Sequence, residues 1–96
     1  MRFDWDIRKD QSNQRKHGIE FSVAEHVFND PFAKRVEDRE VKGEVRWLMI
    51  GCTPAGSLLS VAHTFHETGG EEEVRIISAR KATPHERRLI ETASET

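Results

Sequence analysis

The 96-residue chain contains no tyrosine, one cysteine and three prolines. A lone cysteine excludes an internal disulfide, argues against a thiolate metal cluster and suits a reducing cytoplasm. No apolar run approaches the length of a membrane span, and the residues that follow Met1 lack the apolar core of a signal peptide. These absences predict a cytoplasmic protein with no contact to a membrane.

Charge is what the chain has in abundance. Charged residues make up 33% of it and hydrophobic residues 35%, which predicts a globular fold with a modest core and a single domain over residues 1–96. The net charge of −2 argues against a protein that coats DNA. Basic residues nevertheless gather near the C-terminus, where Glu86 is the one acidic residue among five cations: Arg75, Arg80, Lys81, Arg87 and Arg88.

The segment 74–86 is the most informative part of the sequence. Its β-favouring run at 74–77 predicts a strand. Thr83 then stands at a helix N-cap, with Pro84 at the first helical position and Glu86 at the third, which is a capping box with the favoured proline. The basic side chains of this corner are therefore expected beside a rigid sheet edge, where fixed cations commonly bind carboxylate or phosphate.

A strand and two helices are predicted at the N-terminus. Alternation over residues 2–5 indicates a short strand, and Asp6 caps a polar helix that runs through Lys16 and stops at Gly18. The single large apolar residue of that helix, Ile7, predicts weak packing.

A second capping box, from Ser22 to Glu25, predicts a short helix that ends at Asp30-Pro31. Its inward-facing residues are expected to be Val23, Val27 and Phe28.

The remainder of the chain predicts strands at 32–38, 45–53, 58–66 and 74–81, and a helix at 84–93 whose inward stripe is Leu89, Ile90 and Ala93. The first strand is highly charged and is expected at the sheet edge, whereas 45–53 is nearly all apolar and central. The order β-α-α-β-β-β-β-α indicates an α+β fold, with helices covering one face of an antiparallel sheet and the other face open.

The sequence gives little support for a metal site or a cofactor site. Among the five histidines, the closest pair is His63 and His66, which are three apart on a predicted strand and so point to opposite faces. No glycine-rich phosphate loop follows a strand. We therefore expect neither a metal nor a cofactor.

What remains is a set of cations and imidazoles: Lys16, His17, Arg46, His63, Arg75, Arg80 and Lys81. Such a set suits cleavage of RNA, because the 2′-hydroxyl of the substrate is the nucleophile and the protein need only transfer protons and stabilise a charged phosphorane. Structural explanations also exist. His63 fits a hydrogen-bonded sheet residue, Arg46 fits a cross-strand partner, and Lys16-His17 fits a favourable helix end.

Motifs in both halves of the chain occur together in one known family. They are Phe3-x-Trp5-Asp6, Asn13-x-x-Lys16-His17-Gly18-Ile19-x-Phe21, Phe28-x-Asp30-Pro31, Arg46, Gly51, His63-Thr64 and Arg75-Ile76-Ile77-Ser78-Ala79-Arg80-Lys81-Ala82-Thr83. In this order, between residues 3 and 88, they resemble the BrnT toxins.

The resemblance implies a RelE-like ribonuclease toxin of a bacterial type II toxin–antitoxin module, which cuts RNA without a metal and inhibits translation. It also implies a BrnA-like antitoxin as partner in an oligomeric complex. That antitoxin carries a ribbon-helix-helix part, and the resemblance implies that the complex binds DNA only through this part. The catalytic candidates carried over by position are Arg46, His63, Thr64, Arg75 and Arg80, and the candidates for substrate binding are Lys16, His17 and Lys81.

One departure from the family pattern keeps an alternative open. Members commonly carry a tyrosine near the C-terminus, whereas this chain has none and shows Leu89-Ile90 there. The alternative is a catalytically weak or inactive homologue that acts as a protein-binding module in operon autoregulation.

Overall fold

The computed structural model describes the backbone of residues 1–94 and the side chains of residues 1–91. The elements are β1 (Arg2–Asp4), α1 (Ile7–His17), α2 (Phe21–Ala24), the 3-10 helix η1 (Glu25–Asn29), β2 (Lys34–Val41), β3 (Glu44–Cys52), β4 (Leu58–Thr68), β5 (Glu71–Lys81) and α3 (Pro84–Ser94). None of the helices in this part of the chain has the length and apolarity that crossing a bilayer requires.

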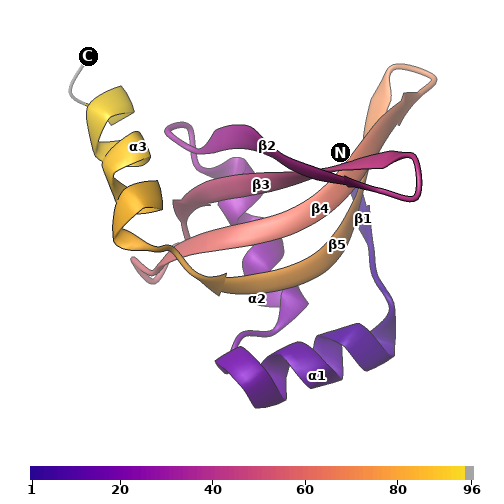
Figure 1. Ribbon diagram of the computed structural model, residues 1–96, viewed down its shortest axis with the longest axis horizontal. Coiled ribbons are helices and arrows are strands. Elements are labelled where there is room, and N and C mark those ends of the chain that lie inside the picture. Colours follow the sequence, from indigo (N-terminus) through magenta and orange to yellow (C-terminus); the bar gives the residue numbers. More distant parts are fainter. Residues whose placement is uncertain (95–96) are drawn as a thin grey trace.

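The strands form one five-stranded sheet in the order β1-β5-β4-β3-β2. All neighbours are antiparallel except β1, which pairs with residues 73–75 of β5 in parallel. The predicted α+β fold and element order are confirmed, as are the edge position of β2 and the β3–β4 hairpin. The turns of the two long hairpins project together from the end of the sheet that lies away from α3 (Figure 1).

The helices do not share one face of the sheet, so that expectation is wrong. Val61 of β4 lies in the core cluster with Phe21 of α2. The preceding residue, Ser60, points to the opposite face and donates a hydrogen bond of 3.4 Å to Glu86 of α3. The short helices α2 and η1 therefore cover one face of the sheet, and α3 covers one end of the opposite face.

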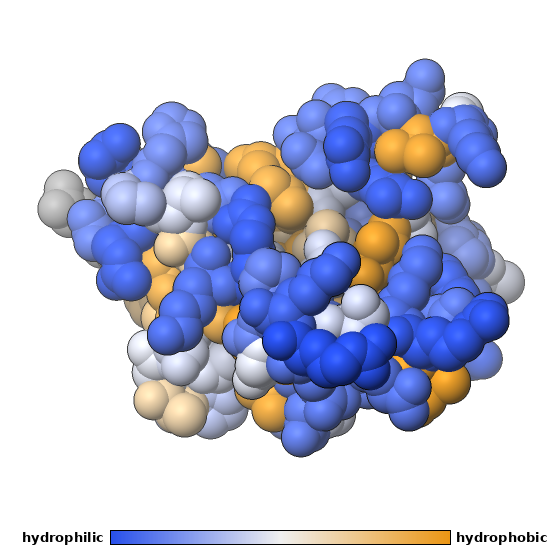
Figure 2. All heavy atoms as spheres, turned by 60° about the horizontal axis from the view of Figure 1, so that its bottom comes forward, coloured by the Kyte–Doolittle hydropathy of each residue, from blue (hydrophilic) through white to orange (hydrophobic). Residues whose placement is uncertain are grey.

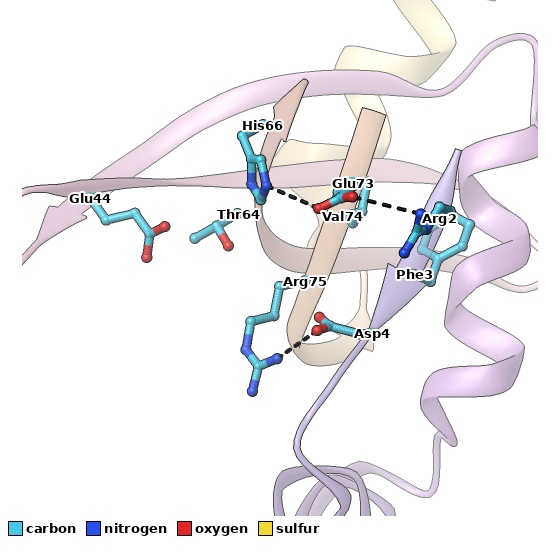
Figure 3. Close-up of a pocket in the computed structure, with 9 residues that line it drawn as sticks. All are labelled: Arg2, Phe3, Asp4, Glu44, Thr64, His66, Glu73, Val74 and Arg75. Carbon is cyan, nitrogen blue, oxygen red and sulfur yellow. Dashed lines mark hydrogen bonds and ion pairs between the residues drawn. The ribbon is translucent and has the colours of Figure 1, made fainter. Parts of the chain in front are cut away.

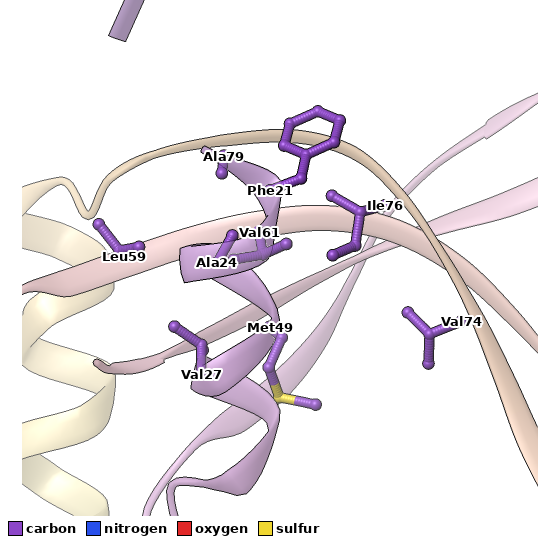
Figure 4. Close-up of a cluster of buried hydrophobic side chains, with 9 residues drawn as sticks. All are labelled: Phe21, Ala24, Val27, Met49, Leu59, Val61, Val74, Ile76 and Ala79. Carbon is purple, nitrogen blue, oxygen red and sulfur yellow. The ribbon is translucent and has the colours of Figure 1, made fainter. Parts of the chain in front are cut away.

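The main core lies between α2, η1 and the sheet (Figure 4). Its buried members are Phe21, Ala24, Val27, Met49, Leu59, Val61, Val74, Ile76 and Ala79. The expected inward position of Val23 is wrong, because its side chain is 44% exposed and Phe21 fills the core instead. The Ser22 capping box is also wrong, since the N-cap of α2 is Glu20, two residues earlier, and it forms no side-chain cap. Of the predicted α3 stripe, Ile90 is buried, whereas the side chain of Ala93 lies outside the described residues.

Helix α1 is attached to the sheet by polar groups in place of an apolar stripe. Ile7 is 63% exposed, as its isolation in the sequence suggested, but Asn13 and Asp10 are buried. The Asn13 amide accepts a 3.0 Å hydrogen bond from the backbone N–H of Ala79 and donates 2.9 Å bonds to the carbonyls of Ala79 and Ile19. These bonds occupy both backbone groups of Ala79, at a point of β5 that β1 does not reach.

Removal of the Asn13 amide is expected to loosen α1. Asn13→Ala leaves the buried N–H and C=O of Ala79 without partners, so the free energy of unfolding should fall by roughly 2–4 kcal/mol. Urea denaturation followed by circular dichroism measures this change. Gln11→Ala, an exposed position of the same helix, is the matched control and should stay within about 0.5 kcal/mol of the parent. Equal stability of the two variants would contradict the role of Asn13.

Candidate functional site

A β-bulge in β5 decides which basic side chains share a face. The register between β4 and β5 shifts between Ala62 and His63, and Ile77 is left as an extra residue in β5. Because residues of a strand alternate between faces, Arg75 and Arg80 would point to opposite sides in a regular strand. The bulge reverses the alternation and puts both on the face opposite α2, which we call the open face.

A groove of about 330 Å³ runs between α1 and the open face. It is lined by Lys9, Ser12, Asn13, Lys16, His17, Arg46, Ile77 and Ser78. Three of these side chains are cations and none is a carboxylate. No hydrogen bond or ion pair joins the side chain of Lys9, Lys16 or Arg46 to any other residue that the structure describes. The groove therefore presents uncompensated positive charge to solvent, which favours a bound anion.

A smaller cavity of about 200 Å³ lies further along the same face. Its lining residues are Arg2, Phe3, Asp4, Glu44, Thr64, His66, Glu73, Val74 and Arg75. In this cavity the charges are mostly paired: Arg75 lies 3.0 Å from Asp4, and His66 Nε2 lies 3.0 Å from Glu73 (Figure 3). Unlike the groove, it is lined by charged side chains of both signs.

The groove and the cavity are neighbours on one surface. Glu44 lines the cavity and Arg46, two positions further along β3, lines the groove. On β5 the cavity ends at Arg75 and the groove begins at Ile77. Figure 2, which turns α1 toward the viewer, shows hydrophilic side chains over most of this side and hydrophobic ones in separate patches. The two hollows therefore lie side by side on the open face.

The structure brings most of the predicted site residues to this surface. Lys16, His17 and Arg46 meet at the groove, and Thr64 and Arg75 meet at the cavity as a directly opposed cross-strand pair. Lys81 does not join them. It pairs with Leu59 of the core, so its side chain leaves β5 on the other face of the sheet.

Arg80 lies on the open face but holds α3 in place. Its guanidinium forms two hydrogen bonds to the carboxylate of Glu86, of 2.7 and 3.0 Å. The same carboxylate accepts the backbone N–H of Thr83 in the predicted capping box. The hydrogen bonds from Arg80, ahead of the other causes, lower the pKa of Glu86 to about 2. The charge of Arg80 is thus compensated within the fold, in contrast to that of Arg46.

His63 lies on the face opposite Arg46 and is fully buried. Its Nδ1 donates to the carbonyl of Val61 at 2.9 Å, while Nε2 accepts a 3.1 Å hydrogen bond from Arg35, which in turn pairs with Glu72. Burial is the main reason why its pKa falls to about 4. His63 is therefore a neutral residue that joins β2, β4 and β5, and the structure does not bring it together with the other catalytic candidates.

Some residues of this surface were not among the sequence-based candidates. Lys9 shares a side of α1 with Lys16, seven positions later, and this helical spacing was a signal available in the sequence. His66 and Glu73 gave no such signal, because only the β4–β5 register makes them opposed partners. Within the described residues, no group of three or more histidine, cysteine, aspartate or glutamate side chains is arranged to hold a metal ion.

Comparison with known proteins places the fold in a family. The model of a family described as "Ribonuclease toxin, BrnT, of type II toxin-antitoxin system" matches residues 5–86. Among solved structures, the crystal structure of the Brucella abortus ribonuclease toxin BrnT is similar, with 28% sequence identity and a TM-score of 0.62 over 86% of this chain and 97% of that one. No curated protein matches the chain.

The neutral state of His63 should make stability depend on pH. Its pKa is about 4 in the fold against 6.5 for an unperturbed histidine, so between these values the unfolded chain binds more protons. The free energy of unfolding is expected to fall by about 2 kcal/mol between pH 7 and pH 5. Denaturant titrations at the two pH values measure this loss. His63→Gln should remove most of the dependence, whereas His26→Gln should keep it. If the unfolding free energy of His63→Gln depended on pH as strongly as that of the parent, this assignment would be contradicted.

Loss of the Arg80 guanidinium should release α3. In Arg80→Ala the carboxylate of Glu86, whose side chain is 10% exposed, is left without its cation, so the unfolding free energy should fall by about 1–3 kcal/mol. Amide hydrogen exchange should show faster exchange in α3 than in β4. Arg87→Ala, on the exposed surface of the same helix, is the control that should leave exchange unchanged. Unchanged α3 protection in Arg80→Ala would show that the ion pair does not hold the helix.

Proposed function

The chain belongs to the BrnT family of ribonuclease toxins of type II toxin–antitoxin systems, and on this premise we propose that it cleaves RNA without a metal and thereby inhibits translation in the cytoplasm. Its open face is the working surface. The observation that supports this most directly is the groove, whose lining cations, Lys9, Lys16 and Arg46, have no carboxylate among their neighbours in it.

The groove is the site for the RNA phosphates. Cations that are already unpaired bind a phosphate without first losing an internal partner, which makes Lys16 and Arg46 the first contacts of the backbone. His17, at the end of α1, adds an imidazole donor beside them. Because α1 is anchored at Asn13, these groups are held at a fixed distance from the sheet.

The reacting phosphate lies over the cavity next to the groove. Arg75 pairs with Asp4, but both side chains are more than half exposed, so the pair is weak and a phosphate competes with the carboxylate for the guanidinium. The hydroxyl of Thr64 lies on the same face, in the same cross-strand row as Arg75. Together they stabilise the negative charge of the phosphorane. Arg80 contributes indirectly, by fixing the end of β5.

The partner is an antitoxin that occupies this surface. A toxin is neutralised most directly when its substrate groove is covered, and a cationic groove favours an acidic or helical segment. We propose a BrnA-like protein with a ribbon-helix-helix part, which binds operator DNA in an oligomeric complex with this chain.

A second candidate function is a binding module without catalysis. The arrangement of Arg75 and Arg80 favours it, since both carry a carboxylate partner in the fold, and the chain has no tyrosine to transfer a proton. In this case the groove binds the antitoxin, and the complex acts only in autoregulation of the operon.

Substitution of the groove cations separates the two functions. Induction of the parent chain should arrest growth, and the purified protein should cleave RNA in EDTA. Lys16→Ala and Arg46→Ala should each lower the cleavage rate by roughly tenfold to a hundredfold, because each removes one charge-assisted phosphate contact. Arg15→Ala, the neighbour of Lys16 outside the groove, is the matched control and should cleave at the parental rate.

Co-expression of the adjacent reading frame should restore growth if it encodes the antitoxin. Absence of cleavage in the parent chain, together with tight binding of that partner, would establish the second function. Parental cleavage by both groove variants would instead show that RNA is bound elsewhere.

A further inference from the structure

The cavity on the open face is built from two rows of side chains across three strands. Arg2 of β1, Glu73 of β5 and His66 of β4 form the first row, because β1 pairs Arg2 with Glu73 and β4 pairs His66 with Glu73. Asp4, Arg75 and Thr64 form the second row in the same way. The β4–β5 register therefore puts the imidazole of His66 one row away from the guanidinium of Arg75 (Figure 3).

His66 has the geometry of an oriented proton acceptor. Its Nε2 lies 3.0 Å from a carboxylate oxygen of Glu73, and no residue that the structure describes forms a hydrogen bond or ion pair with its Nδ1. The side chain is 69% exposed, so the ring is accessible to a polymer that crosses the cavity. A base that is held by a third group and is open to substrate fits the general arrangement of catalytic acids and bases.

Other groups fit this role less well. Both ring nitrogens of His63 are engaged inside the core, and the chain has no tyrosine. His17 lies in the groove but has no carboxylate beside it there. Glu44 lines the same cavity as His66, yet no other side chain holds it in one orientation. Among the described residues that line the two hollows, His66 is thus the imidazole that has a carboxylate beside one ring nitrogen and no partner at the other.

We propose that His66 is the group that takes the proton from the 2′-hydroxyl of the RNA substrate and that Glu73 positions it. This inference rests on the proposed ribonuclease function. As Nδ1 accepts the proton, the 2′-oxygen forms a bond to phosphorus and the bond from phosphorus to the 5′-oxygen breaks. The products are a 2′,3′-cyclic phosphate and a 5′-hydroxyl.

The reaction balances without a co-reactant. The proton that the 2′-hydroxyl gives up equals the one that the leaving 5′-oxygen gains, and solvent carries it between them. Arg75 stabilises the charge of the phosphorane from the neighbouring row. The charged groups that face His66 in the cavity are Glu73 and Arg2 in its own row, Arg75 and Asp4 in the next, and Glu44 from β3.

Chemical rescue tests the role of His66 apart from its contribution to structure. His66→Ala should cleave RNA at least about a hundredfold more slowly than the parent, and added imidazole should restore part of the rate. His26→Ala, outside the cavity, should keep the parental rate and gain nothing from imidazole.

The positioning role of Glu73 has its own readout. Glu73→Gln should lower kcat by roughly tenfold and leave KM within about twofold, since the ring is misoriented while the phosphate contacts stay. Nitrogen NMR of labelled histidine should show the Nε2–H form in the parent and a tautomer mixture in the variant.

A parental rate in His66→Ala, with cleavage still slowed in Arg46→Ala, overturns this inference and leaves the ribonuclease function standing. No cleavage by the parent chain itself overturns both. A slow His66→Ala that imidazole does not rescue assigns the residue to structure and also overturns the inference.

Discussion

The amide of Asn13 is the contact on which the working surface depends. Strand β1 covers β5 only at residues 73–75, so the backbone of Ala79 would face water or an apolar void at the exposed edge. One asparagine side chain satisfies both of its backbone groups and the carbonyl of Ile19 as well. These hydrogen bonds hold a helix whose one large apolar residue, Ile7, is exposed. Lys16 and His17, one turn further on, become a wall of the groove, because residues three and four apart share a helix face.

Local signals in the sequence predicted the order of the helices and strands. They did not predict which side chains share a face of the sheet. The capping box at Thr83 and Glu86 forms as predicted, because it involves contacts within four residues. The bulge at Ile77 has no such local signature, yet it decides that Arg75 and Arg80 share a face. The Asn13 contact to Ala79 likewise joins residues 66 positions apart. Its motif was visible as a resemblance, but its physical role was not, since pairing across the fold is set by tertiary structure.

The distribution of charge explains how a chain with a net charge of −2 presents a cationic groove. Cations needed for structure are paired: Arg80 with Glu86, and Arg35 with Glu72 beside the ring of Phe65. Those in the groove are left unpaired, at a cost in mutual repulsion that a bound anion relieves. The less exposed ion pairs thus mark the cations that hold the fold, whereas the unpaired cations and the exposed Arg75 are available to a ligand. Residue type alone does not reveal this distinction.

The two histidines of strand β4 differ in the same way: one holds the fold and the other is available to a ligand. His63 and His66 lie three positions apart, so the pleat sends them to opposite faces. On the buried side, desolvation keeps the His63 ring neutral, and its two nitrogens bond to Val61 of β4 and to Arg35 of β2. On the open side, His66 keeps one nitrogen on Glu73 and the other free. Proton transfer needs a nitrogen without a permanent partner and a path to the substrate. Of the two rings, only that of His66 satisfies both conditions. The alternation of side chains along β4 therefore decides which of the two histidines is suited to proton transfer.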